Sequence, residues 1–147
     1  MGNYEMMKKL SKIVVRRYVD TDPDLSYLEQ DYPDCTSHQR AAYKSRDAKR
    51  LAKYGAYWFM IGIRAEVMMY TSEDGENWLS NKLTSGGLWC IESDSGEEYL
   101  NKIETEELTE LMAILDELGF PANDRIVEYN RNTVYQNDSS ITFEAII

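Results

Sequence analysis

The chain has few of the residues from which proteins build metal centres and disulfide frameworks. Its 147 residues include two cysteines and one histidine. A structural zinc site takes about four Cys or His ligands, so such a site is excluded unless carboxylates or a second subunit contribute. Cys35 and Cys90 could form one disulfide, but two cysteines are too few for a disulfide-rich secreted scaffold.

Long apolar runs are also lacking. The longest candidate, Ala56 to Ile63, is too short to cross a membrane and is typical of a buried strand. The N-terminal stretch MGNYEMMKKLSK has no apolar core of a signal peptide. Met6 stands where a myristoylation pattern needs Ser or Thr. We therefore expect no membrane partner, reduced thiols and a cytoplasmic location.

Catalytic motifs are scarce as well. Cys35 and His38 are close in the sequence and lie beside a predicted helix start, which favours a chance pairing over a nucleophile with its base. Gly86-Gly87 lacks the following Lys and Ser or Thr of a phosphate-binding loop. No nucleophile-elbow motif is present. These absences predict a protein that is not an enzyme and has no cofactor.

The loop from Asp20 to Asp31 begins like a calcium-binding loop, with Asp22 and Asp24 at alternate positions after Asp20. The calcium pattern needs Gly at its sixth position, where this chain has Leu25. Formation of turns and caps by the Asp side chains is the favoured interpretation, and cation binding is the alternative.

Charge is abundant but uneven along the chain. The net charge is −10, from 16 basic and 26 acidic side chains. Residues 1–64 carry 12 basic and 8 acidic side chains, a balance of +4, whereas residues 65–147 carry 4 and 18, a balance of −14. A surface of this sign repels phosphate, so we expect no direct nucleic-acid binding by the second part. The same surface attracts a basic partner protein.

The pattern of apolar residues predicts a single α+β domain over residues 1–147, with an antiparallel β-sheet meander and two main helices packed against it. Alternating or β-rich segments predict the strands. Helical composition and a leucine stripe predict the helices, the second of which is continuous or divided. The expected strands are 12–19, 57–70, 78–83 and 88–91, with one or two more over 126–129 and 141–147, and the expected helices are 37–53 and 96–118.

Glycines and caps supply the predicted boundaries. Asp74-Gly75 predicts a hairpin, and Gly86-Gly87 predicts a second reversal of the chain. Ser95 and Glu98 fit a capping box at the start of the second helix. Gly119, with a proline shortly after it, predicts the end of that helix.

The second predicted helix is strongly acidic and is the candidate partner-binding site. Its rise of about 1.5 Å per residue places Glu106 and Glu110 about 6 Å apart on one face, and Glu117 continues the row. Such a row resembles the phosphates of a nucleic-acid strand, although for a single helix of this kind a solvated face is the favoured explanation. The candidate residues are Glu97, Glu98, Glu104, Glu106, Glu107, Glu110 and Glu117.

The first predicted helix has the opposite charge. No aromatic platform or base-reading motif accompanies it, so a solvated helix is favoured over a nucleic-acid contact. Its basic residues are Arg40, Lys44, Arg46, Lys49, Arg50 and Lys53.

Two segments resemble parts of a known group of proteins. Ser85-Gly-Gly-Leu-Trp-Cys-Ile-Glu-Ser-Asp-Ser95, followed by Tyr99-Leu100 and the run 104–120, resembles a segment in small uncharacterised proteins of bacteriophages and mobile elements. Asp22-Pro-Asp24-Leu-Ser-Tyr-Leu28 is similar to a second shared segment. Cys90 stands where that pattern has a small residue such as glycine. The resemblance implies no activity, but it implies a setting inside a bacterial host.

These observations lead to one expected function and one alternative. Small acidic phage proteins that resemble nucleic acid and block host defence enzymes, the anti-restriction and anti-CRISPR proteins, offer an analogy of charge and size. We expect a protein that binds and inhibits or modulates a basic, nucleic-acid-handling host protein. The alternative is an oligomeric structural or regulatory phage protein, such as a homodimer, joined through Trp58, Trp78 and Trp89.

Overall fold

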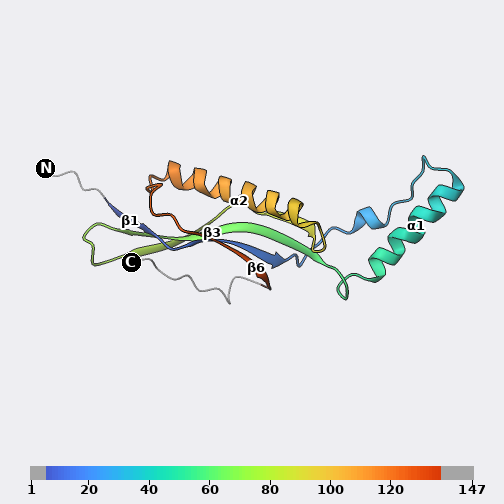
Figure 1. The fold of residues 1–147 in the computed structure, drawn as a ribbon, viewed down its shortest axis with the longest axis horizontal. Coiled ribbons are helices and arrows are strands. Elements are labelled where there is room, and N and C mark those ends of the chain that lie inside the picture. Colours follow the sequence, from blue (N-terminus) through green and yellow to red (C-terminus); the bar gives the residue numbers. More distant parts are fainter. Residues whose placement is uncertain (1–5, 137–147) are drawn as a thin grey trace.

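Strand β3 is the centre of the sheet in the computed structural model, which describes residues 6–136 (Figure 1). Two strands in series, β1 and β2, pair with one edge of β3, and β4 and β5 pair with its other edge. Glu66 of β3, for example, is paired with Val14 on one side and with Thr84 on the other. All four strands are antiparallel to β3. The bounds are Met7–Leu10 for β1, Ile13–Val19 for β2, Met60–Ser72 for β3, Leu79–Thr84 for β4 and Leu88–Glu92 for β5.

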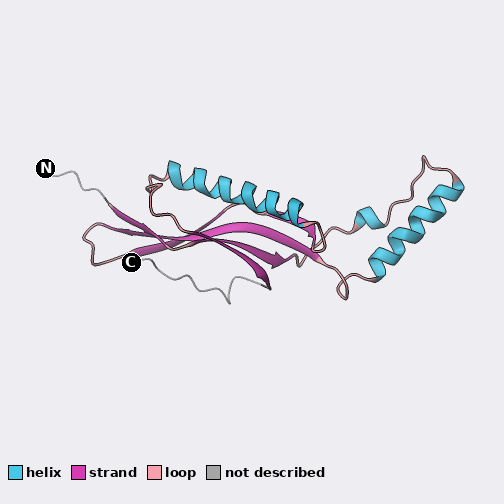
Figure 2. Cartoon of the chain, in the orientation of Figure 1, coloured by secondary structure: helices cyan, strands magenta, loops and turns pink. Residues whose placement is uncertain are grey.

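The sixth strand makes the sheet mixed. Strand β6 (Val127–Tyr135) pairs in parallel with β2, with a register shift between Arg16 and Arg17. The prediction of a purely antiparallel meander is therefore wrong. Helix α2 (Glu97–Glu117) carries the chain from β5 across one face of the sheet to its far edge (Figure 2). A strand–helix–strand connection of this kind makes its two strands parallel.

The two glycine signals have different outcomes. The hairpin at Asp74-Gly75 is confirmed: Gly75 has a φ of 79°, and the Asp74 carboxylate accepts hydrogen bonds from the backbone N–H groups of Glu76 and Asn77. The reversal at Gly86-Gly87 is wrong, because β4 and β5 run in the same direction along one edge of β3. Gly87 instead has a φ of 82° in the short connection between β4 and β5, which follow one another along this edge.

Helix α2 covers one face of the sheet and closes the main core. Strand alternation places Ile61, Ile63, Ala65 and Val67 on this face, as predicted. They pack with Ile13 and Val15 of β2 and with Leu100, Ile103, Leu111 and Leu115 of α2. Burying each aliphatic side chain of this size stabilises the fold by about 1.5–3 kcal/mol.

The boundaries of α2 differ partly from prediction. The helix is continuous and ends before Gly119, whose φ is 77°. The capping box is wrong, because the N-cap is Gly96 and has no side-chain cap. The Ser95 hydroxyl donates instead to the Glu92 carbonyl at 2.6 Å, in the turn that leaves β5.

Helix α1 (Ser37–Ala52) does not pack on the sheet. Together with the 3₁₀ helix η1 (Ser26–Leu28) it forms an arm, residues 26–52, that projects from one end of the sheet (Figure 1). The apolar stripe of α1, formed by Ala41, Ala48, Leu51 and Ala52, consists mainly of alanines, which offer too little area to hold a helix on a sheet face. Asp47 is the one buried residue of α1. The prediction of two helices packed on the sheet is therefore wrong for α1.

A small second core and a cluster of ion pairs anchor the arm. Trp58 and Met60 are buried with Leu28 of η1. The Arg50 guanidinium stacks on the Trp58 ring at 3.8 Å and binds Glu92 at 2.6 Å and Asp94 at 2.7 Å. The direction of α1 therefore depends on contacts made by its last turn.

Within residues 6–136 the fold is α+β, with an open six-stranded mixed sheet and two α-helices. Neither of these helices combines the length and apolarity needed to cross a membrane. The expected strand over 126–129 corresponds to the start of β6, while the one over 141–147 lies outside the described residues.

Acid is expected to loosen the arm through Asp94. Hydrogen bonds from Arg50 hold the pKa of Asp94 below its ordinary value of 3.8. Because the folded-state pKa is lowered, the stability contributed by this pair is present above pH 3.8 and is lost as the pH falls through the lowered pKa. Amide hydrogen exchange in α1, corrected for intrinsic rates, should therefore accelerate on acidification more than exchange in β3.

Asp94→Asn should remove this part of the acid response. Asp34→Asn, which removes an equal charge from an exposed position in the loop before α1, serves as the matched control. An unchanged acid response in Asp94→Asn would show that Asp94 does not hold the arm.

Candidate functional site

The structure divides the seven candidate glutamates into two groups. Glu97, Glu98, Glu106, Glu110 and Glu117 are exposed, whereas Glu104 and Glu107 are buried. All seven lie on α2, but the two buried residues share the helix face of Leu100, Leu111 and Leu115. They therefore cannot belong to a surface that meets a partner.

Glu104 is an internal counter-charge. It is 0% exposed, and its Oε1 accepts a hydrogen bond from Arg131 Nε at 3.0 Å. Arg17 Nη2 lies 3.8 Å from the same oxygen. Arg17 is itself buried, and its Nε and Nη2 make no hydrogen bond to the described residues. Glu104 is therefore placed to compensate a buried positive charge between β2 and α2.

Glu107 ties α2 to the junction between β4 and β5. Its Oε1 accepts hydrogen bonds from Ser85 Oγ at 2.8 Å and from the Gly87 N–H at 2.6 Å. Glu110 accepts from the Gly86 N–H at 3.2 Å but remains exposed. These bonds attach the helix to the edge of the sheet and hold the glutamate row in a fixed position.

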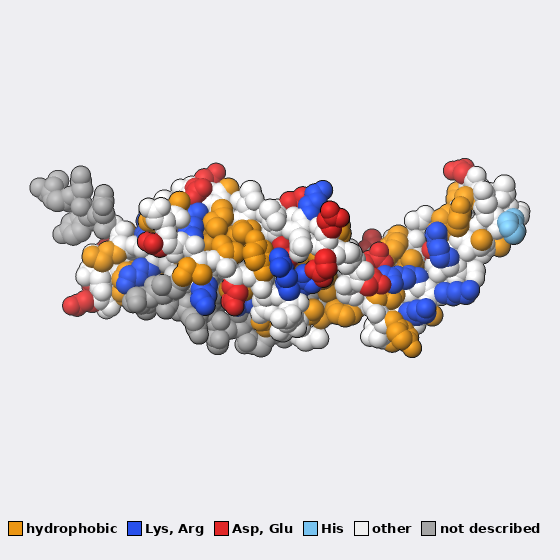
Figure 3. Space-filling view, in the orientation of Figure 1, with side chains coloured by type: hydrophobic (Ala, Val, Ile, Leu, Met, Phe, Trp, Pro, Cys, Tyr) orange, Lys and Arg blue, Asp and Glu red, His pale blue; other side chains and the backbone are white. Residues whose placement is uncertain are grey.

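We call the five exposed glutamates of α2 the acidic flank. None of the five makes an ion pair with the described residues. Lys102 is the single base on α2, and Asp116 is bound by Arg125 at 2.7 Å. Figure 3 shows acidic side chains along the upper edge of the body, where α2 lies, as separate groups with other side chains between them. Within the flank, Glu106, Glu110 and Glu117 share one face of the helix, whereas Glu97 and Glu98 lie at its first turn.

The other sequence candidates are dispersed or structural. His38 is exposed on the first turn of α1 and makes no hydrogen bond to Cys35. Asp20 accepts from the Asp22 N–H at 3.1 Å, and Asp24 accepts from the Ser26 N–H at 3.0 Å, as expected for turn formation. Within residues 6–136 no three His, Cys, Asp or Glu side chains are grouped as a metal site would need.

The three tryptophans do not share a surface. Trp58 is buried, and Trp78 is half-buried under Lys9, whose Nζ lies 4.7 Å from the ring centre. Only Trp89, at 40% exposure, presents a large aromatic surface. A dimer interface that uses all three is therefore excluded.

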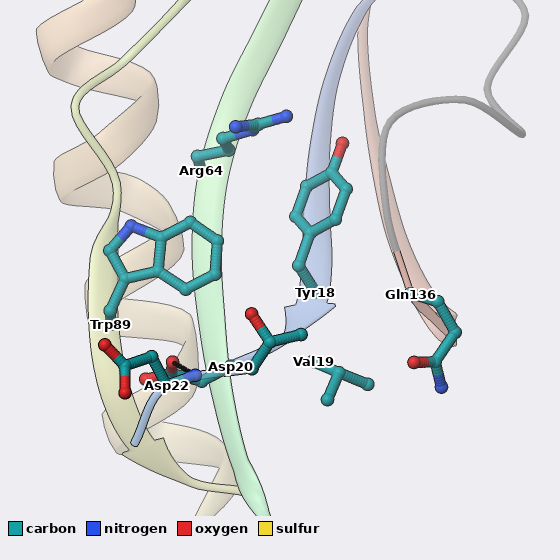
Figure 4. A pocket seen from close by; sticks show the side chains of 8 residues that line it. Tyr18, Val19, Asp20, Asp22, Arg64, Trp89 and Gln136 are labelled. Atoms are coloured by element: carbon teal, nitrogen blue, oxygen red, sulfur yellow. Dashed lines mark hydrogen bonds between the residues drawn. The ribbon is translucent and has the colours of Figure 1, made fainter. Parts of the chain in front are cut away.

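A pocket of about 410 Å³ lies on the sheet face opposite α2, and the sequence did not predict it. Trp89 and Tyr18 form its sides, with Arg64 at one end and Asp20 and Asp22 at the other (Figure 4). Val19, Thr21 and Gln136 complete the lining.

A buried charge network lies beside this pocket. Glu66 of β3 is 0% exposed, and it is approached by Arg16 at 3.0 Å, Arg64 at 2.5 Å and Lys82 at 3.7 Å. The Tyr18 hydroxyl also donates to Glu66. Burial, and then the neighbouring Glu66 carboxylate, raise the pKa of Tyr18, so the phenol stays protonated at neutral pH. One feature of the sequence indicates this network: Arg64 and Glu66 lie on one face of a strand whose other face is apolar.

The backbone around Trp89 is specialised. Gly62 leaves room for the indole, because a Cβ at this position would lie 2.1 Å from Trp89 Cε3. Cys90 adopts a φ of 56°, in the left-handed region that favours glycine. This conformation gives a physical reason for the small residue that the related pattern has there.

The structure brings together the two segments that carry the resemblance. Asp24 N donates to Cys90 Sγ at 3.4 Å, and the Tyr27 hydroxyl donates to Glu92 at 3.2 Å. Cys90 N donates to Asp20 Oδ2 at 3.0 Å. Segments 22–28 and 85–95 therefore meet at the pocket and at the base of the arm.

Comparison with known proteins adds no family to these observations. No protein-family model matches the chain, and no match was found among curated proteins or among solved structures. Functional inference therefore depends on the residues and their geometry.

Glu104 and Glu106 should differ sharply in their effect on stability. Glu104→Gln leaves Arg17 and Arg131 without their counter-charge, and breaking a buried pair in this way costs about 3–5 kcal/mol. Glu106→Gln, two residues away on the exposed side, should change the free energy of unfolding by less than about 0.5 kcal/mol. Urea unfolding of both variants measures the difference, and equal effects would contradict the internal role of Glu104.

Gly62→Ala should destabilise the fold because the added methyl meets Trp89. Overpacking of this kind costs about 1–3 kcal/mol. Gly96→Ala adds a methyl where nothing lies within 4 Å of a Cβ, and its cost of about 1 kcal/mol or less comes from the N-cap position alone. In a Trp89→Ala background the cost of Gly62→Ala should shrink, which a double-mutant cycle measures. The same cost in both backgrounds would show that the indole is not the obstacle.

Proposed function

We propose that the protein binds a basic, nucleic-acid-handling protein of a bacterial host through the acidic flank of α2 and inhibits or modulates it. The observation that carries this proposal is the set of five exposed glutamates, which have no ion pair in the described structure. Residues 65–147, which include the flank, carry a balance of −14. Charge of this density accelerates and orients the approach of a positively charged partner.

The rigidity of α2 supports a recognition role. Leu111 and Leu115 hold its inner face in the core, while Glu104 and Glu107 are bonded to the sheet. Little conformational entropy is then lost when the outer glutamates meet a partner, because the backbone that carries them is already ordered. Glu106, Glu110 and Glu117 form a straight row that a protein adapted to a phosphate backbone can accept in its place.

We propose that the protein comes from a bacteriophage or mobile element. The two related segments support this setting, and the charge supports the analogy with anti-restriction and anti-CRISPR proteins. The proposed activity is binding in the bacterial cytoplasm and needs neither catalysis nor a cofactor. An oligomeric regulatory role is less well supported, because only Trp89 remains of the three tryptophans suggested for an interface.

Charge reversal in the row should abolish inhibition. The variant carries Glu106→Lys, Glu110→Lys and Glu117→Lys, and the assay measures displacement of a fluorescent DNA duplex from purified restriction endonucleases and CRISPR effectors. Three exposed ion pairs at about 0.5–1 kcal/mol each correspond to a loss of roughly tenfold or more in affinity. Displacement by the unmodified protein should weaken as salt is added.

The matched control reverses three exposed glutamates elsewhere: Glu73→Lys, Glu76→Lys and Glu128→Lys. Both triple variants have the same net charge, so a flank-specific role predicts that only the α2 variant loses activity. Equal loss in both would reduce the effect to overall charge. Absence of displacement by the unmodified protein across the panel would count against DNA-competitive inhibition.

A further inference from the structure

The pocket beside Trp89 has opposite charge at its two ends, but the positive end is already engaged. The Arg64 guanidinium is bound to Glu66 at 2.5 Å and lies over the Tyr18 ring at 4.4 Å. Figure 4 places it at the end of the pocket away from Asp20 and Asp22. An anionic ligand would therefore compete with Glu66 for Arg64 and meet two carboxylates as well.

The negative end of the pocket contains one carboxylate that a ligand can bind. Asp20 is buried and bonded to the backbone N–H groups of Asp22 and Cys90. The Asp22 carboxylate is exposed and makes no hydrogen bond or ion pair with the described residues. Asp22 is therefore available to a ligand, and Asp20 holds the loop that positions it.

The indole of Trp89 forms one side of the pocket. It is held between Gly87 and Cys90, both in the left-handed region, and above Gly62. Such a conformation is costly for a residue such as Cys90, and costs of this kind accumulate at functional sites. An indole face that is partly exposed beside a carboxylate is the combination that binds organic cations, through cation–π attraction and a charge-assisted hydrogen bond.

We propose that this pocket binds an organic cation, a guanidinium or ammonium group on an extended stem, with the stem along Trp89 and the charge at Asp22 and Asp20. An arginine or lysine side chain and a free polyamine share this chemistry. The site is on the sheet face opposite α2, because Arg64 and Ile63 point to opposite faces of β3. It is therefore independent of the acidic flank and of the function proposed for it.

Titration with blocked arginine amide tests the site on the full chain. The readout is the indole N–H resonance of Trp89, assigned by its loss in Trp89→Leu, with the resonances of Trp58 and Trp78 as internal references. Blocked arginine should shift the Trp89 signal, whereas the citrulline equivalent, which is uncharged and nearly isosteric, should not. A titration with spermidine distinguishes the two kinds of ligand. Tighter binding of blocked arginine indicates that the pocket takes a protein side chain, and tighter binding of spermidine indicates that it takes a free polyamine.

Asp22→Asn should weaken the binding of blocked arginine by roughly fivefold, as expected for loss of a surface charge pair. Asp34→Asn, an equal charge change in the same long loop but outside the pocket, should leave affinity unchanged. Because the Asp22 side chain has no bond to lose, the fold should survive, and calorimetric affinities can be compared directly. Equal binding of citrulline, no response to any cation, a shift caused by inorganic phosphate instead, or equal effects of the two Asp variants would each overturn the proposal.

Discussion

Burial of β3 on both faces is the constraint on which the rest of the structure depends. On one face its alternate residues, from Ile61 to Val67, meet α2 in an apolar core. On the other, Glu66 is fully buried and needs cations. Arg64 comes from β3 itself, while Arg16 and Lys82 come from strands on its two sides. The charge network therefore depends on the register of three strands, and a shift of one residue would place Glu66 in the apolar core.

This constraint explains which parts of the fold could be predicted from sequence. Strand alternation and the turn at Asp74-Gly75 are local properties, and both appear in the structure as expected. The order of strands depends on long-range pairing, which no local pattern specifies. Gly86-Gly87 therefore predicts a reversal by its local pattern, whereas in the structure a hydrogen bond from Gly87 to Glu107 holds it as the connection between two strands that continue in the same direction. The alanine stripe of α1 has the spacing of a helix that packs on a sheet, but spacing does not report the area available for packing.

The candidate site was predictable to a similar extent. Glu104 and Glu107 are the same residue type as Glu106 and lie in the same acidic run, so composition alone places them together. Their phase on the helix separates them, because they follow Leu100 and precede Leu111 at spacings of three and four residues. The phase also implies that a buried cation must face Glu104, and Arg17 fulfils this from β2. The pocket had no comparable signal, since its lining comes from distant segments of the chain.

Charge therefore acts in two distinct ways in this protein. Inside the fold, Glu66 and Glu104 are partners of arginines and help to set the register of the strands and the position of α2. Outside, the acidic flank keeps its charge because no described residue neutralises it. The inner glutamates hold the helix that carries the outer ones. Under the proposed function, a substitution at either position therefore weakens partner binding for a different reason. Stability measurements separate the two cases, since Glu104→Gln lowers the free energy of unfolding and Glu106→Gln does not.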